Sequence, residues 1–329
     1  MFLFILIIIS IISVIFIMLL IRYPVSISVP SSRGLHLDQK PSSGGLAIFG
    51  AYLLISIYAF IIHHHGVTLS SPILSLFLIT IIGFCDDKYE LSKIFRFVAQ
   101  GIISCLTILS FDLALTEIII WMIFFIFFIN IYNFMDGIDG LAASQAIFIL
   151  LCFSFFNNFY SINSLILYII PIIIFLLYNV SPSKIFLGNT GSYLLGLLIA
   201  ILIFNSSMRL SDIGFINHLM ITAIILTVFI ADTVYVLVVR LIRNIKLSHN
   251  IFSALEYITT PHKSHFYQIL AKKYTSHNKS TLFIMLYNVF WCLPILMFSY
   301  KYIEYVVFFV ILSYLPYFIL CYKNSVGKE

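Results

Sequence analysis

The chain has 329 residues, of which 62% are hydrophobic and only 9% are charged, and its formal net charge is +5. Ordinary globular domains are about 45–50% apolar and about 25% charged, so a mean hydropathy of +1.10 excludes a water-soluble fold and a disordered chain. The apolar runs are continuous, which also excludes an outer-membrane barrel, whose strands alternate apolar and polar residues.

Eleven apolar runs follow one another along the chain, each bounded by polar or charged residues. They lie near residues 2–21, 44–62, 69–85, 94–111, 117–132, 141–156, 163–179, 190–206, 217–239, 281–299 and 303–321. A membrane-spanning helix needs roughly 20 residues, and shorter spans tilt or lie inside a bundle. The first run has no basic n-region and no cleavage site, so we expect a retained span rather than a signal peptide. The sequence therefore predicts an all-α, polytopic integral membrane protein with eleven transmembrane helices, residues 1–329 forming a single transmembrane domain.

The distribution of Lys and Arg predicts the orientation of this bundle. An odd number of spans puts the termini on opposite sides, and cytoplasmic loops of membrane proteins are rich in Lys and Arg. With the N-terminus outside and the C-terminus inside, only Arg209 and Lys301 fall outside. The cytoplasmic loops are then residues 22–43, 86–93, 133–140, 180–189 and 240–280. The basic balance is thus explained by topology, and no nucleic-acid partner is predicted.

The acidic residues indicate where chemistry takes place. Charge near the bilayer is costly and tends to be kept where it has a function. Five carboxylates fall at the predicted cytoplasmic ends of spans, namely Asp86, Asp87, Asp136, Asp139 and Asp232. They predict one site at the inner face. The five cysteines show no CxxC spacing, so neither a disulfide nor a zinc site is expected, and His218 is expected in a solvated outer loop.

Two motifs supply most of these acids. Asp86 and Asp87 are adjacent at a helix end and repel each other unless a cation compensates, as Mg²⁺ bound to carboxylates and substrate phosphates would. A solvated helix terminus beside Lys88 and Lys93 is the alternative. The second motif spaces Asn130, Asn133, Asp136 and Asp139 three residues apart, which predicts that the four share one face if the segment stays helical.

Polar turns and basic loops complete the predicted site. A Gly-rich turn over residues 179–192 enters a helix and would offer free backbone N–H groups to an anion, although a short Gly-rich turn alone is a weak indication. The first loop carries Arg33, His36 and Lys40, and the longest carries Arg240, Arg243, His262 and His265. Such a basic loop can bind anionic lipid heads, but the density of this cluster also suits substrate phosphates.

In this order, these segments resemble the polyprenyl-phosphate N-acetylhexosamine-1-phosphate transferases of glycosyltransferase family 4, which include the bacterial MurNAc-pentapeptide transferase and GlcNAc-1-phosphate transferases. The similarity runs from about residue 30 to 270. It implies that a UDP-N-acetylhexosamine gives its sugar-1-phosphate to undecaprenyl phosphate and releases UMP, with Mg²⁺, or Mn²⁺ in its place. It also implies a multi-pass protein of the bacterial inner membrane in contact with membrane lipid, and a homodimer stays open.

The resemblance also implies roles for single residues. Asp86, Asp87, Asp136 and Asp139 match catalytic aspartates, with Asp87 preferred for activation of the acceptor phosphate. Asn179 and Phe186 match uracil contacts, Arg96 suits the prenyl phosphate, and His262 and His265 match a motif that contacts the sugar nucleotide. Further substrate-binding residues are Asn130, Asn133, Arg240, Arg243, Arg33, His36 and Lys40. The metal ligands would be Asp86, Asp87, Asp139 and Asn189.

Two departures from the family pattern matter. Asn189 stands in Phe186-Leu-Gly-Asn189-Thr-Gly-Ser192 where the family has an aspartate that binds Mg²⁺, so metal affinity should fall. The last loop lacks the adjacent His-His of the GlcNAc-type enzymes and looks more like the O-antigen-initiating subgroup that uses 6-deoxy-N-acetylhexosamines such as FucNAc or QuiNAc. UDP-GlcNAc or such a 6-deoxy sugar is therefore the expected donor, and MurNAc-pentapeptide is the least favoured.

Two other functions remain open. The first is a catalytically silent homologue that binds nucleotide sugar or lipid, which Asn189 motivates. The second is a transporter that couples ions through carboxylates, which predicts acids near the bilayer midplane and broken helices in two related halves.

Overall fold

The computed structural model describes residues 2–28, 39–63, 72–109, 111, 113–156, 162–209, 214–248, 260 and 262–328. The chain divides into two compact units, each described here by itself. The N-terminal unit comprises Met1–Val29, Gln39–Asp136 and Ala142–Arg209, and the C-terminal unit comprises Pro30–Asp38, Gly137–Leu141 and Leu210–Glu329.

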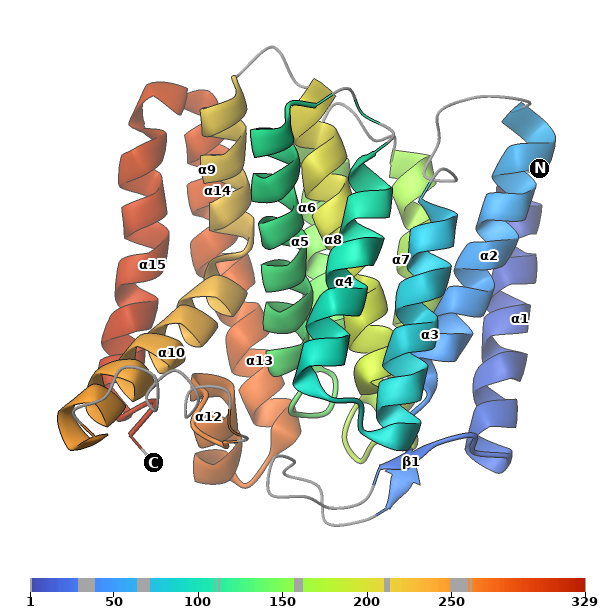
Figure 1. The fold of residues 1–329 in the computed structure, drawn as a ribbon, viewed down its shortest axis with the longest axis horizontal. Helices are drawn as coiled ribbons and strands as arrows, with labels where there is room; N and C mark the ends of the chain where they lie inside the picture. The colour runs from blue at the N-terminus through green and yellow to red at the C-terminus, as the bar shows by residue number, and fades with distance from the viewer. Residues whose placement is uncertain are drawn as a thin grey trace. The chain divides into compact units, whose positions relative to one another are not determined.

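The N-terminal unit is helical apart from one short hairpin (Figure 1). Its helices are α1 (Phe2–Arg22), α2 (Gly44–His63), α3 (Ile73–Tyr89), α4 (Lys93–Ile108), α5 (Leu115–Phe134), α6 (Leu141–Phe156), α7 (Ile162–Asn179) and α8 (Gly188–Arg209). Strands β1 (Ile27–Ser28) and β2 (Lys40–Pro41) pair antiparallel, Ile27 opposite Pro41.

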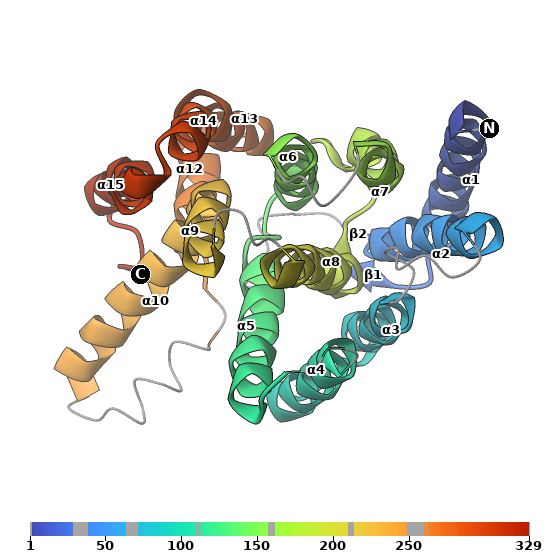
Figure 2. The same ribbon diagram turned by 90° about the horizontal axis from the view of Figure 1, so that it is seen from above.

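Helix α8 forms the interior of this unit. It packs against α2, α3 and α5, and Figure 2 shows it enclosed by neighbouring helices. Over an apolar stretch of 18 residues within Gly188–Met208, 89% of the residues are buried, whereas only 22% are buried over such a stretch within Leu3–Arg22 of α1. A helix that is apolar on every side is favoured in such an interior position. The polar residues at its N-terminus are therefore held inside the bundle by the burial of the rest of the helix.

Glycines let neighbouring backbones approach the first turn of α8. A Cβ on Gly83 of α3 would lie 2.6 Å from the carbonyl oxygen of Asn189, and a Cβ on Gly45 of α2 would collide with the backbone at Gly191. Gly188 has φ of +72°, and a Cβ there would collide with the Ser42 carbonyl oxygen. Only glycine combines that backbone conformation with this close contact.

The C-terminal unit contains a broken helix. Its elements are α9 (Phe215–Ile225), α10 (Thr227–Ser248), α12 (Phe266–Tyr274), α13 (His277–Tyr287), a π-helical turn (Asn288–Cys292), α14 (Leu293–Lys301), a 3₁₀ turn (Ile303–Tyr305) and α15 (Val306–Lys323). Helices α9 and α10 are bent by 82° relative to each other, so the apolar run over 217–239 is not one straight helix. The Thr227 hydroxyl donates to the carbonyl of Ile224 at 2.8 Å, and such a side-chain bond replaces helical bonding at the bend.

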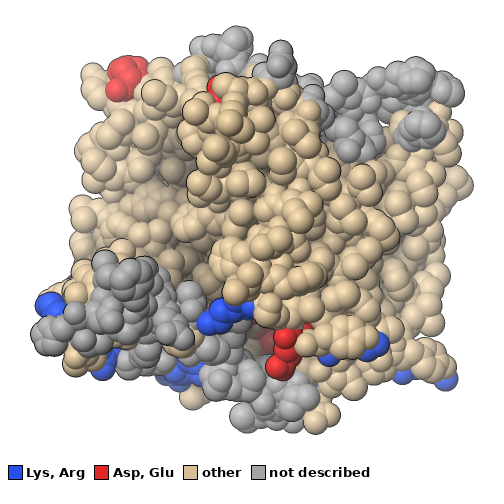
Figure 3. Space-filling model, viewed as in Figure 1, with Lys and Arg blue, Asp and Glu red and all other residues tan. Residues whose placement is uncertain are grey.

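The structure is that of a polytopic α-helical membrane protein. Among the described residues, six helices are long and apolar enough to cross a membrane, or seven if the bent pair counts as one span, and two shorter apolar helices cover Gly44–Ala59 and Leu141–Phe156. Each of the eleven predicted runs overlaps a described helix or a series of consecutive helical elements. In Figure 3, residues without charge cover most of the part of the face that is not drawn in grey, and Lys and Arg lie near its lower edge. His218, predicted in a solvated loop, is instead 2% exposed, because α9 packs against α14 and α15.

Candidate active site

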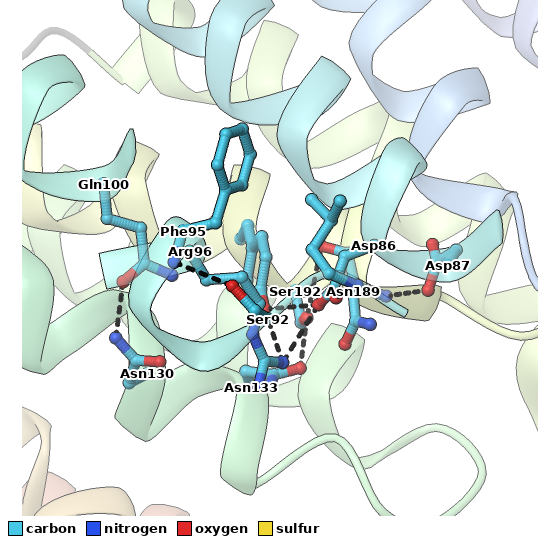
Figure 4. Close-up of polar contacts among 12 residues, drawn as sticks. Asp86, Asp87, Ser92, Phe95, Arg96, Gln100, Asn130, Asn133, Asn189 and Ser192 are labelled. Atoms are coloured by element: carbon cyan, nitrogen blue, oxygen red, sulfur yellow. Dashed lines mark hydrogen bonds and ion pairs between the residues drawn. The ribbon is translucent and has the colours of Figure 1, made fainter. Parts of the chain in front are cut away.

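Asp86 lies in the last turn of α3 and is only 4% exposed. Its Oδ2 accepts hydrogen bonds from Arg96 Nη1 at 3.0 Å and from the Tyr193 hydroxyl at 2.8 Å (Figure 4). Its Oδ1 accepts from the backbone N–H of Leu91 at 3.0 Å. A buried carboxylate needs such compensation, because removing one partner leaves an uncompensated charge. The alternative of a solvated helix terminus is therefore wrong for Asp86.

Asp87 is bound to the N-terminus of α8. Its carboxylate accepts from the N–H groups of Asn189 at 2.8 Å and Thr190 at 2.9 Å, and from the Thr190 hydroxyl at 2.6 Å. The sequence predicted that these N–H groups of the first turn would be free to bind a substrate anion. They are instead bound to the Asp87 carboxylate, which the dipole of the helix attracts to its N-terminus. Asp87 lies beyond the apolar run of α3, and burial raises the pKa of its carboxyl to about 6, although hydrogen bonds from Thr190 and Asn189 lower it.

Two further polar pairs link helices of the N-terminal unit. Asn130 Nδ2 donates to Gln100 Oε1 at 2.6 Å, which joins α5 to α4, and the Ser192 hydroxyl donates to Asn133 Oδ1 at 2.9 Å, which joins α8 to α5 (Figure 4). Helix α5 ends at Phe134. The four side chains were predicted to share one face if the segment stayed helical, and this condition holds only as far as Asn133, because Asp136 and Asp139 follow the helix in a turn.

The turn before α8 brings two predicted nucleotide contacts into a defined geometry. Lys40 Nζ lies 5.4 Å from the centroid of the Phe186 ring and donates to the Ser183 hydroxyl at 3.3 Å. Asn179, which is 5% exposed, donates from Nδ2 to the Ile185 carbonyl at 2.9 Å. In this structure Asn179 closes the turn. Phe186 is half-buried, with a cation beside its ring.

In the C-terminal unit, Asp139 is tied to helix α13. Its Oδ2 lies 3.3 Å from His277 Nδ1, and its carbonyl accepts from the Thr281 hydroxyl at 3.0 Å. Asp139 is 7% exposed. Gly137 of the same turn has no room for a Cβ, which would collide with the hydroxyl of Tyr267. The aspartate turn and the segment after His265 therefore pack together.

The predicted histidine motif is also ordered. His262 and His265 stack with ring centroids 4.9 Å apart, and His265 Nδ1 lies 3.0 Å from Asp232 Oδ1. Arg240 is 4% exposed and donates from Nη2 to the Thr260 hydroxyl at 2.9 Å, whereas Arg243 is exposed on α10. Two predicted substrate contacts, Arg33 and His36, lie outside the described residues.

The donor chemistry at the N-terminus of α8 fits a hard cation. Asp86, Asp87 and Asn189 offer oxygen donors, which Mg²⁺ prefers, and Mg²⁺ needs only one or two carboxylates beside substrate phosphates and water. Within the described part of the chain, no three His, Cys, Asp or Glu side chains gather as a preformed metal site.

Several partners of the predicted residues were missed. Tyr193 and Thr190 bond the aspartate pair, Asp232 bonds His265, and His277 bonds Asp139. Asp232 carried a signal, since it is an acid within a long apolar run. Tyr193, Thr190 and His277 are ordinary residues in sequence, and only the packing of distant helices reveals their partners.

This arrangement defines a helical membrane protein with buried aspartates at the end of a central helix and ordered histidines in its second unit. Residues 69–207 match glycosyl transferase family 4. The chain is also 28% identical over 284 residues to a Bacillus subtilis (strain 168) protein, the probable undecaprenyl-phosphate N-acetylglucosaminyl 1-phosphate transferase. That match covers 79% of this chain and 74% of the relative. Both similarities support the resemblance to this family that the motifs of the sequence indicated.

Proposed function

We propose that this protein transfers N-acetylhexosamine-1-phosphate from a UDP-sugar to undecaprenyl phosphate, giving undecaprenyl-diphosphate-sugar and UMP. The observation that carries the proposal is the compensated aspartate pair Asp86–Asp87 at the N-terminus of the buried helix α8. The name of the Bacillus subtilis relative supports the same acceptor lipid. We also propose that the donor is UDP-GlcNAc or a UDP-linked 6-deoxy-N-acetylhexosamine, and that the reaction initiates the synthesis of O-antigen or another envelope glycan.

The proposed reaction requires little covalent chemistry from the protein. An oxygen of the lipid phosphate forms a bond to the β-phosphorus of the UDP-sugar, and the bond from that phosphorus to the bridging oxygen breaks, so UMP leaves with this oxygen. Catalysis of phosphoryl transfer consists mainly of positioning and charge neutralisation. Bound Mg²⁺ would supply part of that neutralisation, held by Asp86, Asp87, Asn189 and Asp139.

The protein's own residues have distinct parts in this proposal. Arg96 orients Asp86 through an ion pair, and α8 orients Asp87 through two backbone N–H groups. Lys40 beside Phe186 suits a uridine nucleotide, since the ring can stack on a base while the ammonium attracts a phosphate. His262 and His265 are proposed to contact the sugar nucleotide, and Asn130, Asn133 and Asp136 to line the site.

The proposed location follows from the substrates and the charge pattern. We propose eleven spans, with the N-terminus outside, the C-terminus inside and the site on the cytoplasmic side of a bacterial inner membrane. There a soluble nucleotide sugar and a lipid acceptor can meet.

Only one bent helix pair occurs in the described ranges, whereas a transporter of the repeat type would place broken helices in two related halves.

The test measures UMP release by purified protein given undecaprenyl phosphate, Mg²⁺ and a panel of UDP-N-acetylhexosamines. We expect release that requires lipid and metal, and a loss of at least about 100-fold in Asp87→Asn, because a charge held for the transition state is removed. Glu90→Gln is the matched control, since Glu90 is an exposed acid at the C-terminus of α3 and its loss should leave the rate unchanged. Absence of UMP with every donor would overturn the proposal.

A silent binding protein is the second candidate, and Asn189 favours it because the amide brings no charge to a metal. In that case UDP-sugar binds to the wild-type protein without UMP release. The donor panel decides between the two functions, since binding is measured on the same samples by calorimetry.

A further inference from the structure

Asp232 of α10 is a fully buried carboxylate whose two oxygens converge on the histidine segment. It has 0% exposure. Its Oδ1 lies 3.0 Å from His265 Nδ1 and accepts from the N–H of Phe266 at 3.1 Å. Its Oδ2 accepts from the N–H of Tyr267 at 3.4 Å and from the Tyr317 hydroxyl at 3.1 Å. The carboxylate therefore caps α12 and contacts the imidazole at the same time.

The charge of Asp232 determines which nitrogen of His265 carries a proton. An ionised carboxylate can only accept hydrogen bonds, so the nitrogen that faces it, Nδ1, must be the donor. The proton on one ring nitrogen is set by the hydrogen bond that this nitrogen makes. In the neutral imidazole Nε2 is then left as the acceptor, and no protein partner for Nε2 is found among the described residues.

Packing fixes the plane of the same ring. The His265 ring stacks on His262, with centroids 4.9 Å apart, and on Tyr267, with centroids 5.5 Å apart, and both pairs are inclined by only 25°. The backbone before the ring is held as well, because the N–H of Gly327 donates to the Ser264 carbonyl at 3.1 Å. The ring thus has one orientation and one direction for Nε2.

We propose that Asp232 is a positioning residue, which holds His265 as the Nδ1–H tautomer and directs Nε2 to the UDP-sugar. This inference rests on the proposed function in that His265 contacts the sugar nucleotide. An aspartate behind a histidine has this role in other enzymes and metal sites, where its loss typically costs about 10- to 100-fold. Asp232 itself does not touch the substrate.

Asp232→Asn is the informative variant, because the amide keeps the shape of the side chain but offers one donor and one acceptor. A neutral amide holds Nδ1–H less strongly than a carboxylate does. Its nitrogen, placed at the position of Oδ1, can pair with unprotonated Nδ1 at the cost of facing the N–H of Phe266, so the Nδ1–H tautomer is favoured less than in the wild type. Tyr317→Phe is the matched control. It removes a buried hydrogen bond to Oδ2 and leaves the bond from Oδ1 to His265 in place.

The experiment has two readouts, and neither requires turnover. Nitrogen-15 spectra of histidine-labelled protein, with His265 assigned through His265→Gln, should show a protonated Nδ1 and an unprotonated Nε2 in the wild type and in Tyr317→Phe. Asp232→Asn should show a mixture. Calorimetry with UDP-N-acetylhexosamines should show a Kd about 10- to 100-fold higher in Asp232→Asn and a Kd within about 3-fold of wild type in Tyr317→Phe.

An Nε2–H tautomer in the wild type would overturn the inference, as would equal losses of affinity in both variants, which a purely structural role predicts. Failure of the proposed function has a different outcome. It appears as absence of UMP release while the tautomer and its dependence on Asp232 are still observed.

Discussion

Asn189 stands where the family pattern has an aspartate, and its surroundings indicate how the missing charge affects metal binding. Its backbone N–H donates to Asp87 Oδ1 at 2.8 Å, so its side chain emerges beside a carboxylate at the N-terminus of α8. An amide oxygen there can contact a cation but contributes no charge. The electrostatic attraction for Mg²⁺ must then come from the aspartates and from substrate phosphates.

Asn189→Asp should therefore strengthen metal binding. We expect the Mg²⁺ concentration for half-maximal UMP release to fall by at least about 10-fold, because each hard-cation site is tuned by the number of charged ligands. The helix dipole stabilises a carboxylate at this position by about 0.3–1 kcal/mol. Without metal, we expect the repulsion between the new carboxylate and Asp87 to exceed that stabilisation. The Tm of the variant should thus lie below wild type in chelator and rise more steeply with Mg²⁺.

Asn189→Ala is the matched control and should require more Mg²⁺ than wild type if the amide oxygen is a ligand. Identical metal dependence in Asn189→Asp, Asn189→Ala and wild type would show that position 189 does not contact the ion. A titration of UMP release against Mg²⁺, with a thermal-shift series on the same samples, separates these results.

Charged residues of the site could be predicted from the sequence, whereas their partners could not. Asp86, Asp87 and Arg96 are conspicuous because charge is rare in so apolar a chain. The pairing of Asp86 with Arg96 lies within one helix–turn–helix and was partly foreseeable. By contrast, Thr190 lies 103 residues from Asp87, and nothing local distinguishes it from any threonine in a polar turn.

At the scale of elements, the site depends on how closely α3 approaches α8. Gly83 lies opposite the first turn of α8, and a Cβ there would come within 2.6–2.8 Å of backbone atoms of Asn189 and Thr190. Backbone atoms cannot move aside as a flexible side chain can. The two hydrogen bonds from that turn to Asp87, on the next turn of α3, require this short distance.

Gly83→Ala should separate the two helices and weaken the site. Overpacking of a filled interior costs about 1–3 kcal/mol, so we expect a lower Tm together with loss of UMP release. Gly101→Ala in α4 is the matched control, because the nearest heavy atom to its Cβ would be Ile126 Cδ1 at 3.6 Å, an ordinary contact. Alanine favours a helix over glycine by about 0.5–1 kcal/mol. A stable, active Gly83→Ala protein, measured beside Gly101→Ala, would contradict this account of the contact.

Element positions followed from hydropathy, but breaks within them did not. Every predicted run coincides with helix, because burial in lipid or in a bundle demands uninterrupted apolar residues. The break at Leu226 has no proline or glycine beside it, and the partners of the neighbouring Thr227 hydroxyl, Ile224 and Ser313, appear only in the folded unit. The end of α5 before Asp136 was likewise hidden, since the spacing of three suited a longer helix.

At the scale of the whole molecule, the remaining question is how the helices cross the bilayer. Length and composition identify six or seven spanning helices among the described residues, whereas the apolar runs predict eleven spans. Helices α2, α3, α4 and α6 account for the difference. The apolar parts counted for α2 and α6 are Gly44–Ala59 and Leu141–Phe156, and α3 and α4 have only 17 and 16 residues and contain charged ones. An odd total puts the termini on opposite sides, and an even total puts them on the same side.

Reporter fusions at both ends distinguish these arrangements. All Lys and Arg except Arg209 and Lys301 fall on one side when eleven spans are counted, and the positive-inside rule makes that side cytoplasmic. We therefore expect a C-terminal fluorescent protein to fold and fluoresce, and a C-terminal alkaline phosphatase to be inactive, because these two reporters require opposite compartments. A cysteine placed at Ser325, in the tail after α15, should react with an impermeant maleimide only in inverted vesicles, whereas an epitope before Met1 should be accessible in intact spheroplasts.

Both ends in the same compartment would exclude eleven spans. Both ends reversed would move the aspartates of α3 to the outer face, away from any cytoplasmic nucleotide sugar, and the proposed transferase reaction would lose its donor.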